Sequence, residues 1–169
     1  MILRCTRKLR DELRLDGHEL LGSEAAPARL DEWFCDLLRI DRQKYVLCTH
    51  ARTLFSIVLP QVRRADLVHL PTMLAGTVSG AMEREGFAVA AIETVTSLQE
   101  VRYGLTNSRS VLGSMNDISY QYLGDLEMNG NAARLRGLTG EELNRNPLSA
   151  IGRRYAIDAM RGELSLNRH

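Results

Sequence analysis

The stretch NSRSVLGSMND, residues 107–117, carries the densest set of side chains that could do chemistry. On a helix that begins there, residues spaced by four, three and four positions fall in one strip about 60° wide. This strip contains Arg109, Gly113, Asn116 and Tyr120. It combines a guanidinium fork, an amide, a phenol and a bare glycine backbone that permits close approach, which together are typical of a binding site.

We expect this polar strip to lie at the rim of the core, beside the apolar stripe of the same helix rather than opposite it. The apolar stripe comprises Val111, Met115, Ile118, Tyr122 and Leu126. The ligand- or partner-binding residues that we predict are Arg109, Gly113, Ser114, Asn116, Asp117 and Tyr120.

A structural explanation of the same residues stays open. Gly113 and Ser114 would then be small so that another element can cross the helix. The side chains of Arg109, Asn116 and Asp117 would cap neighbouring backbone groups instead of binding a ligand.

A second polar cluster, NRNPLSAIGRRY, covers residues 144–155. Ser149 could cap the following helix and bind an anion at its amino end, and Arg153 and Arg154 could contact phosphate or an acidic partner. Two arginines do not make a basic patch, so we favour a solvated helix face. We also expect the hairpin turn with Arg42 and Lys44 to be a solvated loop.

The sequence contains no phosphate-binding loop, dinucleotide-binding glycine motif, zinc-protease motif or nucleophile elbow. The histidines at positions 18, 50, 69 and 169 have no helical i, i+4 partner among themselves, so we expect no metal and no cofactor. Cys5, Cys35 and Cys48 lie in apolar surroundings, and we expect reduced core thiols, with a Cys35–Cys48 bridge as the alternative. An odd number of cysteines and an opening that does not resemble a secretory leader favour a cytoplasmic protein.

The composition indicates one globular domain over residues 1–169, because 44% of the residues are hydrophobic and 25% are charged. The 22 basic and 21 acidic residues leave a net charge of +1, which gives no electrostatic reason to expect a nucleic-acid or membrane partner. No stretch approaches the roughly 20 apolar residues that a membrane span needs.

Alternating or β-branched runs predict strands at 2–5, 45–49, 53–59 and 100–106. Residues 30–40 fit a helix or a strand, and we favour a strand in their second half, joined to the next by a four-residue turn at 41–44. Helical spacing predicts helices at 7–15, 66–85, 88–98 and 109–128, a short helix at 139–144, and a helical region at 148–164. This order predicts an α+β fold with a single mixed, mainly antiparallel sheet covered by helices.

Four segments resemble an uncharacterised bacterial domain family of about this length. They are MILRCT, IDRQKYVLCTHARTLFSIVLP, NSRSVLGSMND and NRNPLSAIGRRY. The resemblance covers most of the chain in matching order, and SVLGSMND, residues 110–117, is its most distinctive element. It implies a single cytoplasmic domain without implying a substrate.

We predict a non-enzymatic interaction or regulatory module, antitoxin-like, that binds a protein partner or a second copy through the polar strip and the hairpin edge. The alternative is a small enzyme or binder of a nucleotide or other anionic ligand. In that case Arg109 would hold the anion, Asn116 would orient it, and Asp117 would be the general base. Nucleic acid is the least expected partner, because the charge is balanced and aromatic residues are few.

Overall fold

The computed structural model describes residues 1–15, 20–24, 27–152 and 154–166. The strands are β1 (Ile2–Cys5), β2 (Leu20–Leu21), β3 (Glu32–Ile40), β4 (Gln43–His50), β5 (Ser56–Leu59), β6 (Arg102–Leu105), β7 (Pro147–Leu148) and β8 (Arg154–Tyr155). The α-helices are α1 (Arg7–Leu13), α2 (Leu70–Arg84), α3 (Val89–Thr96), α4 (Arg109–Asn129), α5 (Asn131–Thr139) and α6 (Ala156–Leu166). The 3-10 helices are η2 (Asp66–His69), η3 (Leu143–Arg145) and η4 (Ser149–Ile151).

Six strands form one mixed sheet in the order β2-β6-β1-β3-β4-β5, which confirms the predicted α+β fold. Of the five pairings within this sheet, β3 with β4 and β4 with β5 are antiparallel, and β1 with β3, β1 with β6 and β2 with β6 are parallel; the two antiparallel pairings contain 12 of the 22 residue pairs. Side-chain alternation does not report strand direction. Helices follow β1 and precede β6. A connection that contains a helix can lead the chain back to the end of the sheet where the previous strand began, so that neighbouring strands are parallel.

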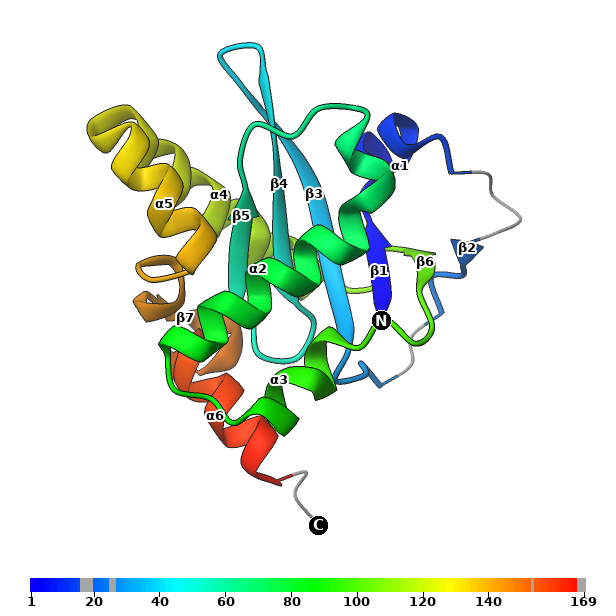
Figure 1. Cartoon of the computed structure of the whole chain (residues 1–169), viewed down its shortest axis with the longest axis vertical. Helices are drawn as coiled ribbons and strands as arrows, with labels where there is room; N and C mark the ends of the chain where they lie inside the picture. The colour runs from blue at the N-terminus through cyan, green and yellow to red at the C-terminus, as the bar shows by residue number, and fades with distance from the viewer. Residues whose placement is uncertain (16–19, 25–26, 153, 167–169) are drawn as a thin grey trace.

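The sheet is the middle of three layers. Side chains alternate between the faces of a strand, so β3 sends Trp33 and Cys35 to one face and Phe34 and Leu38 to the other. The first face packs against α2, which crosses the front of the sheet in Figure 1, and against residues of α1, α3 and α6. The second face packs against α4, which lies behind the sheet in the same view.

The β3–β4 hairpin projects beyond the rest of the sheet (Figure 1). Its turn contains two residues, Asp41 and Arg42, rather than the predicted four, because Ile40 already pairs with Gln43. Both turn residues have left-handed backbones, with φ of 47° and 65°, as a two-residue hairpin turn with the twist of its strands requires. The strand predicted for the second half of 30–40 is confirmed, and it begins earlier than predicted, at Glu32.

The predictions for the carboxyl-terminal third need two corrections. Residues 131–139, rather than 139–144, form a helix, because Gly130 and Gly140 with positive φ set its ends. The region predicted as helical from residue 148 first forms β7, η4 and β8, and a helix begins only at Ala156. Ser108 caps α4, since its hydroxyl accepts a hydrogen bond from the Val111 N–H (3.3 Å).

The three cysteines are free and buried in the core, as predicted. They lie side by side on adjacent strands, where Cys35 is paired with Cys5 on one side and with Cys48 on the other. A hydrogen bond with Cys35, together with burial, raises the pKa of the Cys5 thiol well above its usual value. Within the described residues, no helix has the length and the apolar run that a bilayer crossing requires.

Candidate functional site

The polar strip of α4 lies on the outer side of this helix, which corrects the expectation of a rim position. All four of its residues are exposed, and Tyr120 is 74% exposed. At about 100° per residue, the centre of the strip lies about 160° from the centre of the buried stripe. The centre of the strip therefore points away from the sheet, while Asn116 and Tyr120 also line a hollow next to β3.

No element crosses α4 at Gly113. A Cβ added at Gly113 would have no atom of another element within 4 Å, which removes the close-crossing explanation for this residue. Ser114 is buried, and its hydroxyl donates to the Ser110 carbonyl one turn earlier (3.1 Å).

A hollow of about 370 Å³ lies between β3 and α4, and we call it the β3 hollow. One wall is the distal half of β3, the consecutive residues Asp36 to Ile40. The other wall is the α4 side chains Asn116, Ser119, Tyr120 and Leu123, and Lys8 of α1 closes one end. The Thr6 hydroxyl donates to the Asp36 carboxylate (2.5 Å), so this acid is already hydrogen-bonded at the mouth.

A second hollow, of about 560 Å³, lies on the other side of Tyr120, and we call it the β7 hollow. It joins the two polar clusters that the sequence singles out. Ser114 and Asp117 come from the first, Pro147, Leu148 and Ser149 come from the second, and Tyr120 and Gln121 of α4 complete the lining. Ser149 does not cap a long helix, because it begins the three-residue η4.

The three residues assigned to an anionic ligand do not share a hollow. Asn116 lines the β3 hollow, Asp117 lines the β7 hollow, and Arg109 lines neither. No ion pair joins Arg109 to Asp117 in the described structure. The geometry therefore gives a general base at Asp117 no anion-holding partner in the same space.

Residues 2–159 match a known protein family described as a domain of unknown function, DUF6933. The chain belongs to this family. The match includes β3, α4 and the β7–β8 region, and therefore both hollows. No curated protein and no solved structure matches the chain.

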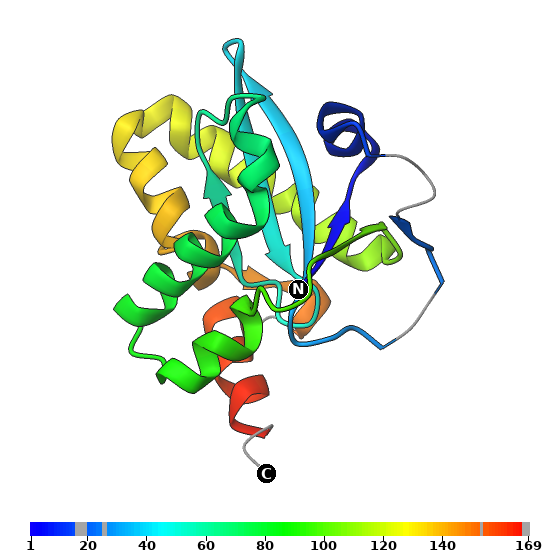
Figure 2. The same ribbon diagram turned by 45° about the vertical axis from the view of Figure 1, so that its right-hand side comes forward.

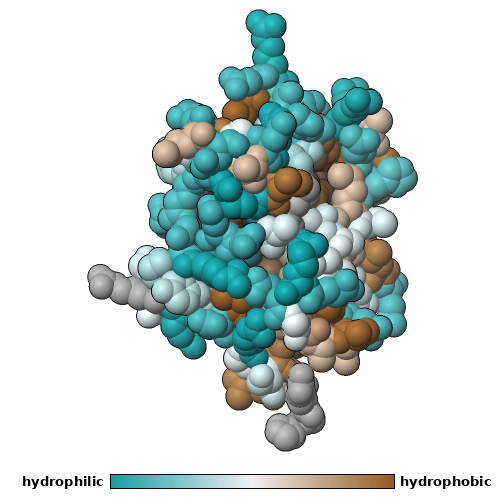
Figure 3. Space-filling view, turned by 60° about the vertical axis from the view of Figure 1, so that its left-hand side comes forward, coloured by the Kyte–Doolittle hydropathy of each residue, from teal (hydrophilic) through white to brown (hydrophobic). Residues whose placement is uncertain are grey.

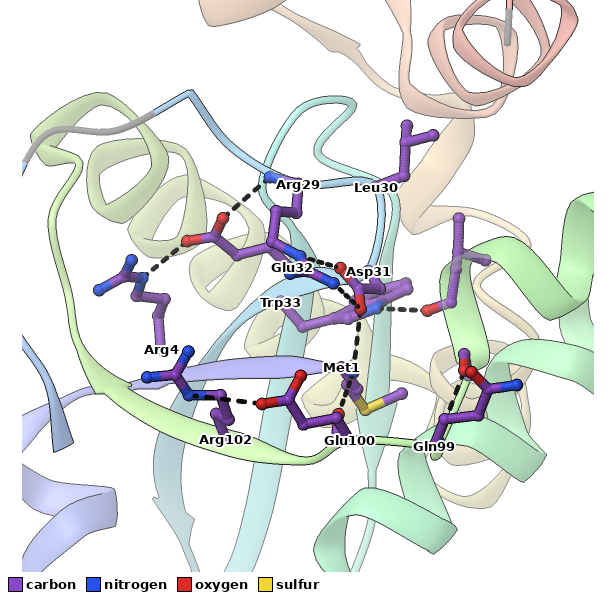
Figure 4. Close-up of polar contacts among 12 residues, drawn as sticks. Met1, Arg4, Arg29, Leu30, Asp31, Glu32, Trp33, Gln99, Glu100 and Arg102 are labelled. Carbon is purple, nitrogen blue, oxygen red and sulfur yellow. Dashed lines mark hydrogen bonds and ion pairs between the residues drawn. The ribbon is translucent and has the colours of Figure 1, made fainter. Parts of the chain in front are cut away.

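In this DUF6933 domain, the largest buried charge network has a structural role (Figure 4). The Arg4 guanidinium donates to Glu32 (2.6 Å) and to the Gly22 and Leu105 carbonyls (2.6 and 3.0 Å). The second Glu32 oxygen accepts from the Arg29 N–H (3.0 Å). These internal contacts connect β1, β3 and β6, so the two buried charges are paired within the protein.

The described residues hold no group of three or more His, Cys, Asp or Glu that is placed to bind a metal. The buried His50 is also structural. Its Nδ1 accepts from the Thr53 N–H (3.3 Å), so its Nε2–H donates to the Leu30 carbonyl (2.9 Å). Burial lowers the pKa of His50 to about 4, and the ring is neutral at physiological pH.

The sequence reasoning missed the β3 wall and Lys8. The sequence did contain a signal for this wall. The strand that ends at Ile40 is longer than the four-residue strand at 2–5, so a pairing between the two would leave part of the longer strand without a partner.

Hydrophobic side chains are scattered among hydrophilic ones on the side of the molecule that carries α5 and α6 (Figure 3). That side therefore offers no competing apolar patch.

Proposed function

We propose that the protein is a non-enzymatic interaction module that binds an extended segment of a partner protein against the free edge of β3. The observation that carries this proposal is the β3 hollow, where distal β3 and two residues of the polar strip, Asn116 and Tyr120, line one space. A regulatory role of the antitoxin kind requires no more than such docking.

The backbone of distal β3 is oriented to accept a strand. Ala51 N–H donates to the Glu32 carbonyl, so even-numbered residues of β3 turn their backbone groups toward β4. The odd-numbered residues, including Leu37 and Arg39, turn theirs toward the side of β1. There β1 pairs only as far as Cys35, and no described strand continues the pairing (Figure 2). Such an edge is a template for strand addition.

The side chains around this edge define the segment that would fit. Leu38, Ile40 and Leu123 offer apolar surface, while Asn116 and Ser119 offer hydrogen-bonding groups. Every second side chain of an added strand would lie against α4. Tyr120 is exposed beside the hollow, and tyrosines of this kind are common among the residues that dominate binding energy.

The opposite edge of the sheet is closed to strands. The side-chain amide of the buried Asn144 accepts from the Ser56 N–H of β5 (2.6 Å) and donates to the Ser56 carbonyl (2.8 Å). One side chain thus takes both backbone bonds that a pairing strand would use at Ser56. Helix α5 also packs along β5. The contrast between the two edges favours β3 as the place where another chain is bound.

The test uses proline at Arg39, whose side chain is 66% exposed. Proline removes the Arg39 N–H on the open side and leaves the β3–β4 hydrogen bonds intact. The control is Arg39→Ala, which loses the same ion pair with Glu12 but keeps the N–H. Both variants are first compared with the wild type by circular dichroism and thermal unfolding.

A display library of random peptides is then selected on the wild-type protein, and the affinities of the recovered peptides are measured. We expect peptides that bind the wild type and Arg39→Ala alike and lose about tenfold or more in affinity for Arg39→Pro. Tyr120→Ala should weaken them by a similar factor. The proposal is wrong if no peptide binds saturably, or if Arg39→Pro binds as well as Arg39→Ala.

A further inference from the structure

We infer that a hollow on the other side of the hairpin binds a small ligand with adjacent phosphate groups, such as pyrophosphate or a nucleoside diphosphate. This basic hollow has a volume of about 440 Å³ and lies between the start of β4 and the segment that follows β5. Four cationic side chains line it, Arg42, Lys44, Arg63 and Arg64. The proposal concerns a different edge of the hairpin from the β3 hollow and does not rest on the proposed function.

The lining of the basic hollow includes no acid, and two acids that contact its lining residues, Glu12 and Asp66, are already engaged. Glu12 binds Lys44 and Arg39, and the Lys44 ammonium lowers the pKa of this carboxyl. Asp66 accepts a hydrogen bond from the Arg63 backbone N–H (2.8 Å). This contact involves the backbone of Arg63 and not its guanidinium group.

The Glu12 carboxylate interacts with Arg64 without forming an ion pair with it. Three guanidinium groups therefore share this hollow without a directly bound carboxylate among the described residues. Those of Arg42, Arg63 and Arg64 form no ion pair with other described residues. Like charges that line one hollow repel one another, and an anion that enters it relieves the repulsion. A chain with a net charge of only +1 has gathered an excess of positive charge at one place.

The residue types suit phosphate in particular. Guanidinium forks bind phosphate oxygens through two parallel hydrogen bonds, and a lysine adds a compact point charge. The floor is braced by Gln43, whose side-chain oxygen accepts from Tyr45 Oη (3.1 Å) and Gln61 Nε2 (3.0 Å). Three guanidinium groups without ion pairs are more than a single phosphate group requires. We therefore infer a ligand with adjacent phosphate groups.

The experiment is isothermal titration of the full chain with pyrophosphate, ADP and adenosine at low ionic strength. The test variant is Arg63→Ala/Arg64→Ala. Both side chains are exposed, so the variant is expected to fold, which circular dichroism checks. The control is Arg84→Ala/Arg102→Ala, which removes the same charge from two exposed arginines outside the lining.

We expect saturable binding of pyrophosphate and ADP, no binding of adenosine, and weaker binding as salt is added. The test variant should lose about tenfold or more in affinity, and the control should change by less than about twofold. Absence of saturable pyrophosphate binding, an unchanged test variant, or an equal loss in the control would each overturn the inference. None of these results depends on peptide binding at β3.

Discussion

Replacing Asn144 with alanine tests the most concentrated set of buried polar contacts in the molecule. Asn144 is 1% exposed and lies in η3, far along the chain from β5. Its amide makes the two hydrogen bonds with Ser56 and a third to the Gly140 carbonyl (2.8 Å). Gly140 has to be glycine here, because its φ is 67° and a Cβ would lie 2.8 Å from the Ser56 carbonyl oxygen.

The magnitude follows from the groups that lose their partners. In Asn144→Ala, the Ser56 N–H and C=O both stay buried without hydrogen bonds, and each costs about 1–3 kcal/mol. The expected loss in the free energy of unfolding is therefore about 2–6 kcal/mol. For a chain of this size, each kcal/mol lowers Tm by about 2–4 °C, which predicts a drop of roughly 10 °C.

Asn144→Asp tests the direction in which stability changes with pH. The carboxylate keeps the acceptor for Ser56 N–H but faces two carbonyl oxygens, so burial and repulsion should raise its pKa. A raised folded-state pKa means that stability is greatest below the unfolded pKa of about 4 and is lost as the pH rises through the folded value. This variant should thus be relatively more stable in acid than at neutral pH.

The assay is urea unfolding followed by circular dichroism, with calorimetry for Tm. Asn146→Ala is the matched control, because Asn146 has only an exposed contact with Gln121 (3.0 Å) and should lose less than about 0.5 kcal/mol. If Asn144→Ala unfolds at the same urea concentration as this control, the account of the closed β5 edge is refuted.

Two further predictions concern the core and the helices. Since burial depresses the pKa of His50 to about 4, the unfolded state takes up a proton first, and stability should fall by about 2 kcal/mol between about pH 7 and about pH 5. Urea unfolding at both pH values should show this loss in the wild type and not in His50→Gln. Gly113→Ala should raise the free energy of unfolding by about 0.5–1 kcal/mol, because a Cβ there meets no other element. Gly137→Ala should lower it by about 1–3 kcal/mol, because its Cβ would lie 2.7 Å from the Tyr122 ring, and equal effects of the two substitutions would contradict this reasoning.

The sequence pattern was sufficient wherever a segment buries one regular face. The β-branched and aromatic residues in 45–49 predicted β4, and the helical spacing in 109–128 predicted α4 nearly to its ends. It failed where tertiary contacts decide the structure. Residues 143–145 form η3 around the side chain of Asn144, whose partners on β5 are remote in sequence. The direction of each strand pairing could not be predicted either, because it depends on the path of the segment that connects the two strands.

The candidate site was predictable in part. Helical spacing identified Asn116 and Tyr120 as polar neighbours, but their position relative to β3 depends on how α4 packs across the sheet. The basic hollow was not predictable, because Arg42 and Lys44 looked like an ordinary charged turn. Only the fold brings Arg63 and Arg64, about twenty residues later, to the same space.

The two ends of the sheet order show why β3 rather than β5 is the edge to consider for a partner. An exposed edge strand invites uncontrolled pairing, and proteins close such edges with helices, short strands or charges. Here β2 has two residues, and β5 is held by Asn144 and α5. Distal β3 is the longer stretch without a strand partner among the described residues; α1 and the α4 side chains flank it, and Leu37 and Leu38 are buried. The proposed strand addition would supply the pairing that this stretch lacks.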